Sequence, residues 1–413
     1  MKGISKGNNR FDFRRLWLAV VLGSFVAIGP LSMDMYLPAL PVLTADIGGT
    51  TSLVQLSITA CLLGMAMGQL LIGAISDQKG RKRPLIISLA VYSISSLLCA
   101  FAPSIEILLL LRFVQGVSGA GGIVIARAIV RDLFSGVELT RFFALLMLVN
   151  GAAPILSPVI GGVILNFTSW RGVFIILCIL GALMVAAACF GVKESLSPSN
   201  RSSGGIKNTF IVFRHLLGDR MFMGYALAQG FVSAAMFGYI AGSPFVIQNI
   251  YGASPQMFSF IFALNGVGII IASQVTGRLA GKVKEEKMLI IGLCMALLGG
   301  ISLIAMIVFQ AGLISVLIPL FFVVSSVGIV GTTTFALAMQ NQRKSAGSAA
   351  ALLGLIPFLL GSITAPLTGI GGEQSAIPMG IVIVGCQMFA MLAYFLMTQR
   401  RSVKKGLVKS ANF

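Results

Sequence analysis

Repeated apolar stretches, each long enough to cross a bilayer as a helix, constrain this sequence most. A transmembrane helix needs roughly 20 apolar residues, and the chain of 413 residues supplies twelve such stretches. Only helices and closed barrels can span lipid, and these stretches are too long for strands. Charged residues make up only 10% of the chain, against about 25% in soluble domains. We therefore predict an all-α membrane protein with twelve transmembrane helices and exclude a soluble globular domain.

The predicted spans fall into two sets of six. The first set is Leu16–Pro41, Leu53–Ile75, Pro84–Phe101, Ile105–Ala126, Phe142–Phe167 and Val173–Val192. The second set is Met221–Ile247, Phe258–Leu279, Met288–Phe309, Leu313–Met339, Ala346–Ile370 and Ile377–Thr398. Between them, residues 193–220 are rich in Ser and Gly, which is typical of a linker. We expect an N-terminal six-helix half (1–192), a cytoplasmic linker (193–220) and a C-terminal six-helix half (221–413).

The basic residues predict the topology, because cytoplasmic loops retain Lys and Arg. Of the 30 basic residues, 28 fall in the two tails, the linker and every second loop. This distribution places both termini and the linker in the cytoplasm. It also explains the net charge of +18 without a nucleic-acid partner, for which the sequence offers no motif.

Asp34 is the one acidic residue of twelve that lies well inside a predicted span. An ionisable group in hydrocarbon is costly and is a functional candidate by default. Counting at 1.5 Å per residue, Asp34 and Arg112 both lie roughly 10 Å from the outer end of their spans. Burial favours the protonated carboxyl and a nearby arginine favours the carboxylate, so Asp34 is a candidate for proton exchange. The alternative is a purely structural Asp34–Arg112 pair that ties two helices together.

The loop between the second and third spans has a distinctive pattern at residues 73–84, Gly-Ala-Ile-Ser-Asp-Gln-Lys-Gly-Arg-Lys-Arg-Pro. Asp77 follows a helix, Gly80 permits a tight reversal, and Arg81 and Lys82 follow it. Cytoplasmic positive charge alone would explain the bases, but it would not explain Asp77 or the glycine spacing.

This loop resembles the G-x-x-x-D-x-x-G-R-K-x-P motif of the major facilitator superfamily. The resemblance implies two pseudo-symmetric six-helix halves and a loop that latches the carrier in one access state, through Gly73, Asp77, Gly80, Arg81 and Lys82. Residues 32–41, Ser-Met-Asp-Met-Tyr-Leu-Pro-Ala-Leu-Pro, resemble the first span of its bicyclomycin and chloramphenicol resistance subfamily (Bcr/CflA) of drug:proton antiporters.

Two further stretches resemble motifs of the same superfamily. Residues 111–116, Leu-Arg-Phe-Val-Gln-Gly, match the fourth-span R-x-x-Q-G motif, which implies a part in proton transfer for Arg112. Residues 154–162 resemble the fifth-span antiporter motif G-P-x-x-G-G, although Ser157 stands where the motif has glycine. We expect Pro154 and Pro158 to kink this span, and Gly161 and Gly162 to permit close helix packing. Ordinary small-residue packing is the alternative interpretation.

The second half carries only weak echoes of these patterns. Residues 277–282, Gly-Arg-Leu-Ala-Gly-Lys, resemble a degraded copy of the 73–84 loop, and Pro357 and Pro366 echo the prolines of the fifth span. Such echoes fit the internal repeats of carrier folds. Polar residues expected to line a substrate cavity are Tyr36, Gln55, Asn150, Gln229 and Asn265.

These patterns predict a proton-coupled exporter of small amphipathic drugs, such as bicyclomycin or amphenicols, in a bacterial cytoplasmic membrane. We expect no cofactor or metal, because the proton gradient drives transport, and we expect a monomer. Enzyme chemistry has no support, since neither a phosphate loop nor a nucleophile triad is present. The rivals are a facilitator or exporter of a metabolite, such as a sugar or amino-acid derivative, and a membrane receptor or scaffold that does not transport.

Overall fold

The computed structural model describes residues 9–48, 50–134, 136–201, 213–340, 342 and 346–398, with backbone only for 9–16, 200, 346–348 and most of 136–150. The long helices of the first half are α1 (Asn9–Asp34), α3 (Thr51–Lys79), α4 (Lys82–Ala100), α5 (Ile105–Leu133), α6 (Gly136–Ile164) and α7 (Trp170–Gly191). Those of the second half are α9 (Arg220–Pro244), α10 (Pro255–Leu279), α11 (Glu285–Val308), α12 (Leu313–Met339), α13 (Ala346–Leu367) and α14 (Ile377–Thr398). The twelve predicted spans are thus confirmed in the described part of the chain.

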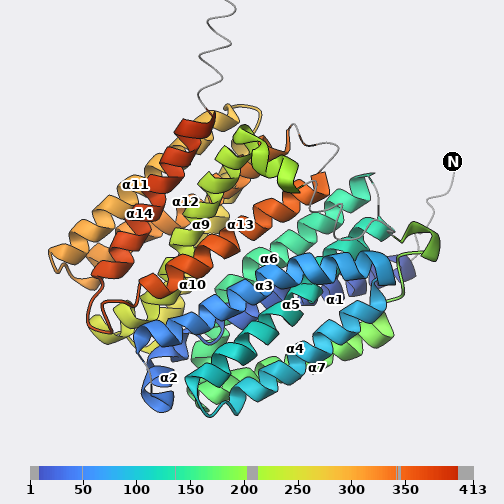
Figure 1. The fold of residues 1–413 in the computed structure, drawn as a ribbon, viewed down its shortest axis with the longest axis horizontal. Coiled ribbons are helices and arrows are strands. Elements are labelled where there is room, and N and C mark those ends of the chain that lie inside the picture. The colour runs from blue at the N-terminus through green and yellow to red at the C-terminus, as the bar shows by residue number, and fades with distance from the viewer. Residues whose placement is uncertain are drawn as a thin grey trace, which may run out of the picture.

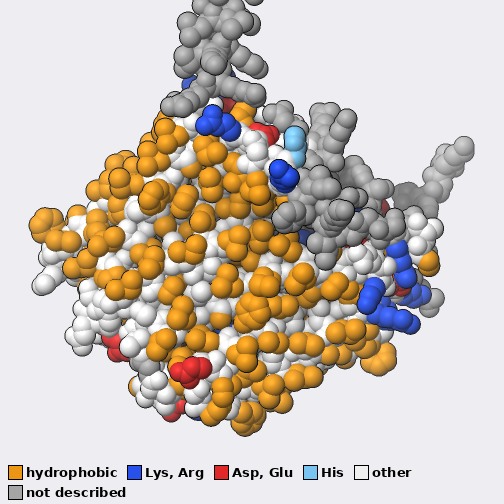
Figure 2. Space-filling view, in the orientation of Figure 1, with side chains coloured by type: hydrophobic (Ala, Val, Ile, Leu, Met, Phe, Trp, Pro, Cys, Tyr) orange, Lys and Arg blue, Asp and Glu red, His pale blue; other side chains and the backbone are white. Residues whose placement is uncertain are grey.

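The two groups of six helices lie against each other, with α3 and α6 of the first facing α13 and α10 of the second (Figure 1). Eleven of the described helices are long and apolar enough to cross a membrane, and α6 has a shorter apolar part, Gly151–Ile164. Hydrophobic side chains cover most of the visible surface, and charged side chains gather towards its ends (Figure 2). The fold is that of a multi-span membrane protein with two six-helix halves. The exact bounds 1–192, 193–220 and 221–413 stay a prediction.

The sequence predicts one continuous helix for the first span, but the structure breaks this helix. After α1 ends at Asp34, a short 3-10 turn, η1 (Leu37–Ala39), leads into α2 (Leu40–Ile47). Pro38 explains the break, because its nitrogen has no hydrogen to donate to the Asp34 carbonyl four residues earlier. Asp34 therefore lies at a helix end rather than inside a helix.

Two ends of the molecule matter for function. The linker end carries the turn at Gly80 and residues 193–201, where the first half leads into the linker. The far end carries η1, α2 and the π-helical turn η3 (Phe245–Ile250) that follows α9. Gly80 and Gly281 both have positive φ, at 91° and 79°, which only glycine adopts easily, and they occupy corresponding loops of the two halves.

The largest cluster of buried hydrophobic residues joins the halves. It includes Met35 and Leu37 from the first half together with Tyr239 and Phe258 from the second. A second cluster is built mainly from the second half, and a third lies wholly in the first half. The shared cluster places the seam between the halves next to Asp34.

Candidate functional site

Asp34 is the last residue of α1 and is 5% exposed. Its carboxylate makes no hydrogen bond or ion pair with any residue that the structure describes. Its chain neighbours Met35 and Tyr36 belong to the buried cluster that joins the halves, so Asp34 lies at the seam.

Arg112 of α5 is completely buried in the first half. Its Nη1 group donates to the Ser32 carbonyl at 2.8 Å and to Gln115 Oε1 at 2.5 Å. Its Cζ atom lies 4.5 Å from the centroid of the Tyr36 ring, within range of a cation–π interaction. The Nε and Nη2 groups have no partner among the described residues.

The expected Asp34–Arg112 ion pair is absent from the contacts of the described residues, which corrects the interpretation as a structural tie between helices. Matching depth in two spans does not fix the direction of the side chains. Arg112 turns towards Ser32, Gln115 and Tyr36, and none of these contacts involves Asp34. The two charges lie in one region without direct contact.

The residues expected to line a cavity have different surroundings. Tyr36 is buried, and its hydroxyl lies 2.8 Å from Ser57 Oγ. Asn265 donates to the Tyr239 hydroxyl at 2.9 Å, and Gln229 accepts from Thr334 Oγ1 at 3.0 Å. Gln55 contacts the opposite half through the Ala241 carbonyl. The side chain of Asn150 lies outside the described residues.

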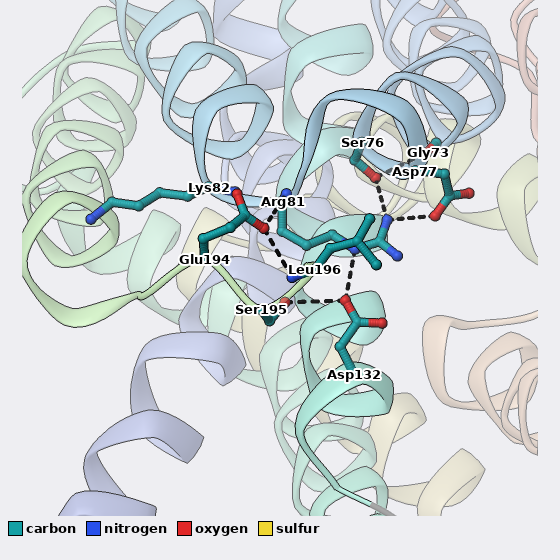
Figure 3. A network of polar contacts seen from close by, with 9 residues as sticks. All are labelled: Gly73, Ser76, Asp77, Arg81, Lys82, Asp132, Glu194, Ser195 and Leu196. Carbon is teal, nitrogen blue, oxygen red and sulfur yellow. Dashed lines mark hydrogen bonds and ion pairs between the residues drawn. The ribbon is translucent and has the colours of Figure 1, made fainter. Parts of the chain in front are cut away.

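The loop that carries the 73–84 motif forms a charged network at the linker end (Figure 3). Arg81, with a side chain only 3% exposed, donates to Asp77 Oδ1 at 2.5 Å and to Asp132 Oδ2 at 2.8 Å. It also donates to Ser76 Oγ at 2.9 Å. Burial disfavours the charged guanidinium, but the hydrogen bonds to Asp132 and Asp77 outweigh burial and raise the pKa of Arg81 above its ordinary value.

Glu194, just after α7, caps the start of α4. Its carboxylate accepts from the backbone N–H groups of Arg81 at 2.8 Å, Lys82 at 3.1 Å and Leu196 at 3.0 Å. Partial burial opposes ionisation, but these N–H groups and the Arg201 charge hold the pKa of Glu194 below its ordinary value. Anions are favoured at helix N-termini for the same reason.

Two other motif residues pack the network onto neighbouring helices. The Lys82 ammonium donates to the Cys189 carbonyl of α7 at 2.8 Å. Gly73 faces Val124 of α5, where an added Cβ would lie 3.2 Å from Val124 Cγ1. All described contacts of this network lie within the first half and the start of the linker.

The predicted prolines and glycines of the fifth span lie in α6. Pro154 and Pro158 are inside the helix. A Cβ at Gly161 would overlap the Met35 carbonyl oxygen, and one at Gly162 would lie 2.6 Å from Ser259 Oγ of α10. α6 therefore packs closely against the broken first span and against the second half.

Several polar partners escaped the sequence analysis. Asp132 and Glu194 were read only as charges near span ends, yet both bind Arg81. Gln115, although within the fourth-span motif, was given no role, and it links Arg112 to Ser96 Oγ at 2.7 Å. An acidic residue directly after a span, as at Glu194, was the one available signal for these partners.

Known proteins match this chain over nearly its whole length. A model of the Major Facilitator Superfamily matches residues 20–366. The Bacillus subtilis protein called uncharacterized MFS-type transporter YdgK is 43% identical over 389 residues, which cover 94% of this chain and 96% of that protein. The bicyclomycin resistance protein homolog of Haemophilus influenzae is 30% identical over 387 residues, with 94% and 97% covered.

The fold has solved counterparts. A bacterial homolog of the human lysosomal transporter Spinster, in an inward-facing and unoccupied conformation, superposes with a TM-score of 0.73 at 14% identity. The match covers 95% of this chain and 98% of that one, and at this identity it supports the fold alone. The chain is a transporter rather than an enzyme, and it belongs to the major facilitator superfamily, in the group of relatives that includes the bicyclomycin resistance proteins.

Proposed function

We propose that the protein is a secondary active exporter that exchanges inward protons for the outward movement of a small amphipathic drug, with bicyclomycin and amphenicols as first candidates. The observation that carries this proposal is Asp34, a buried carboxylate at the seam without an ion-pair partner among the described residues. A charge held in this way is costly in a membrane and is relieved by binding a proton or a cationic group. The similarity to a bicyclomycin resistance protein homolog supports the drug class.

In this proposal Asp34 binds the proton or competes with the substrate for it. Arg112 acts indirectly. It donates hydrogen bonds to Ser32 and Gln115, and its guanidinium over the Tyr36 ring adds positive charge to this region. Alternating access moves the seam between the two halves around a central site. The Arg81 network and α6, with its Pro154 and Pro158, control the switch between access states.

The remaining parts of the proposal concern setting. The distribution of basic residues supports a bacterial cytoplasmic membrane with both termini and the linker on the cytoplasmic side. The carrier acts as a monomer without a cofactor, and the proton gradient supplies the driving force. The rival function is a facilitator of a metabolite, and the first experiment must distinguish it from the proton-coupled exporter.

The test measures proton release from purified protein in weakly buffered detergent when each drug of a panel is added. Asp34→Asn is compared with wild type, and the matched control is Glu106→Gln, which neutralises an exposed carboxylate at the start of α5. We expect release from wild type and from the control, and none from Asp34→Asn. If all three proteins bind a drug equally and release no proton, the antiport proposal fails and the facilitator takes its place.

A further inference from the structure

Gln55 of α3 joins the two halves at the far end. The side chain is 1% exposed, and its Nε2 group donates to the Ala241 carbonyl of α9 at 3.1 Å. Its Oε1 atom accepts from Thr368 Oγ1, just after α13, at 3.2 Å. Gly369 approaches so closely that an added Cβ would overlap Gln55 Oε1. One amide therefore binds two elements of the opposite half.

The backbone around Ala241 explains why a side chain is needed there. In a regular helix the Ala241 carbonyl accepts from the N–H of residue 245, but Phe245 donates to Gly242 instead, where α9 gives way to η3. A carbonyl without a partner is costly away from water. The Gln55 amide satisfies this carbonyl from the other half.

Two more glutamines make similar contacts at the same end. Gln248 of η3 donates to the Pro38 carbonyl of η1 at 3.3 Å. Gln256 of α10 donates to Asn166 Oδ1 at 2.6 Å and to the Gly162 carbonyl at 3.4 Å. All of these donors and acceptors are neutral. Gln248 is partly buried and Gln256 is exposed, so Gln55 is the fully enclosed member of the set.

We propose that Gln55 is a gating residue, which holds the far end closed through Ala241 and Thr368 and releases it only when water replaces these two partners. When the halves separate there, the amide and the Ala241 carbonyl both lose their partners at once, and each needs water. Opening is thereby coupled to hydration of the seam. This role differs from the substrate-cavity role expected from the sequence, and it requires only that the carrier alternates between access states, whatever drives it.

Gln55→Leu tests the gate in the full-length protein by hydrogen–deuterium exchange in detergent. We expect faster deuterium uptake in residues 37–47, 245–252 and 368–376, by about fivefold for one net hydrogen bond lost. Uptake around residues 76–83 at the linker end should not increase. Substrate affinity should stay at the wild-type value while the turnover rate changes. The control Gln274→Leu makes the same replacement at an exposed position of α10 and should leave the pattern unchanged.

Gln55→Glu provides a second test that does not depend on a loss of packing. A protonated glutamic acid can still donate to the Ala241 carbonyl, but the carboxylate cannot. We expect far-end uptake close to wild type in acidic buffer, and a difference from wild type that grows as the pH rises.

Either of two results overturns the gate. One is wild-type far-end uptake in Gln55→Leu together with weaker substrate binding, which would make Gln55 a cavity contact. The other is a far-end difference in Gln55→Glu that does not change with pH. If Gln55→Leu exchanges faster everywhere, it is misfolded, and the pH series of Gln55→Glu decides. Neither result depends on proton release, so the gate and the antiport proposal can fail separately.

Discussion

The Arg81 network at the linker end and the Gln55 contacts at the far end hold helices together by different chemistry. The linker-end network is charged, and its described contacts stay within the first half and the start of the linker. The far-end contacts are neutral amides and carbonyls that cross from one half to the other. In the proposed transport cycle, charges therefore hold one half together, whereas neutral groups lie where the two halves must separate.

The free energy needed to separate each kind of contact explains why the two sets of contacts differ. Separating a buried ion pair leaves two charges without partners, and this costs far more than separating a neutral hydrogen bond. A seam that opens and closes in each transport cycle can use amides, because water replaces an amide partner with little net loss. A loop that keeps its shape throughout the cycle can use charges.

The largest effect is expected for Arg81→Ala. The substitution leaves Asp132, whose side chain is 12% exposed, without its guanidinium partner. We expect the free energy of unfolding to fall by about 3 kcal/mol, measured by thermal unfolding in detergent. Arg83→Ala removes a neighbouring exposed charge as the control. Equal melting of the two variants would show that the linker-end charges do not stabilise the fold.

A smaller effect is expected for Gly369→Ala at the far end. Its new methyl group would overlap Gln55 Oε1 and push the halves apart. We expect the free energy of unfolding to fall by about 1–2 kcal/mol, in the usual range for overpacking, and the transport rate to fall as well. Gly385→Ala is the matched control, because nothing lies within 4 Å of its added Cβ. If both variants transport like wild type, the close approach of the halves is not needed.

The smallest effect concerns pH at the linker end. The pKa of Glu194 is lowered in the folded protein, so its stabilising contribution is present above the unfolded pKa. The contribution is lost as the pH falls through the lower folded pKa. We expect acid to increase deuterium uptake in residues 80–85 more in wild type than in Glu194→Gln, whose amide does not titrate. An equal increase of deuterium uptake in the two proteins at low pH would contradict the role of Glu194 as the cap of α4.

The helices were predictable because each span carries its own hydropathy signal. Predicted and observed bounds coincide for Leu313–Met339, and the last span starts at Ile377 in both. The prediction for the fourth span ended at Ala126, whereas α5 continues to Leu133, since the charged residues Arg127 and Arg131 lie on a helix that extends past the apolar stretch. The break after Asp34 was missed because Pro38 and Pro41 stand within a run that stays apolar.

The site was predictable only where its contacts are local. Arg81 and Asp77 are four residues apart, on either side of the turn at Gly80, so their pairing is local in the sequence. Gln55 and Ala241 are 186 residues apart, and no local pattern links them. Span depth brought Asp34 and Arg112 to the same level, but depth carries no information about rotation around the helix axis. That rotation decides which charges meet.

The end of α1 at Asp34 has a consequence for the charge of the substrate. A helix directs its unpaired carbonyl groups, and a partial negative charge, towards its C-terminal end. Asp34 is the last residue of α1, so the helix end adds its own negative potential to that of the carboxylate. In the proposed exporter, the surroundings of Asp34 should therefore attract positive charge more strongly than a lone aspartate would. Anionic compounds should be poor ligands there, and cationic or neutral compounds should bind best.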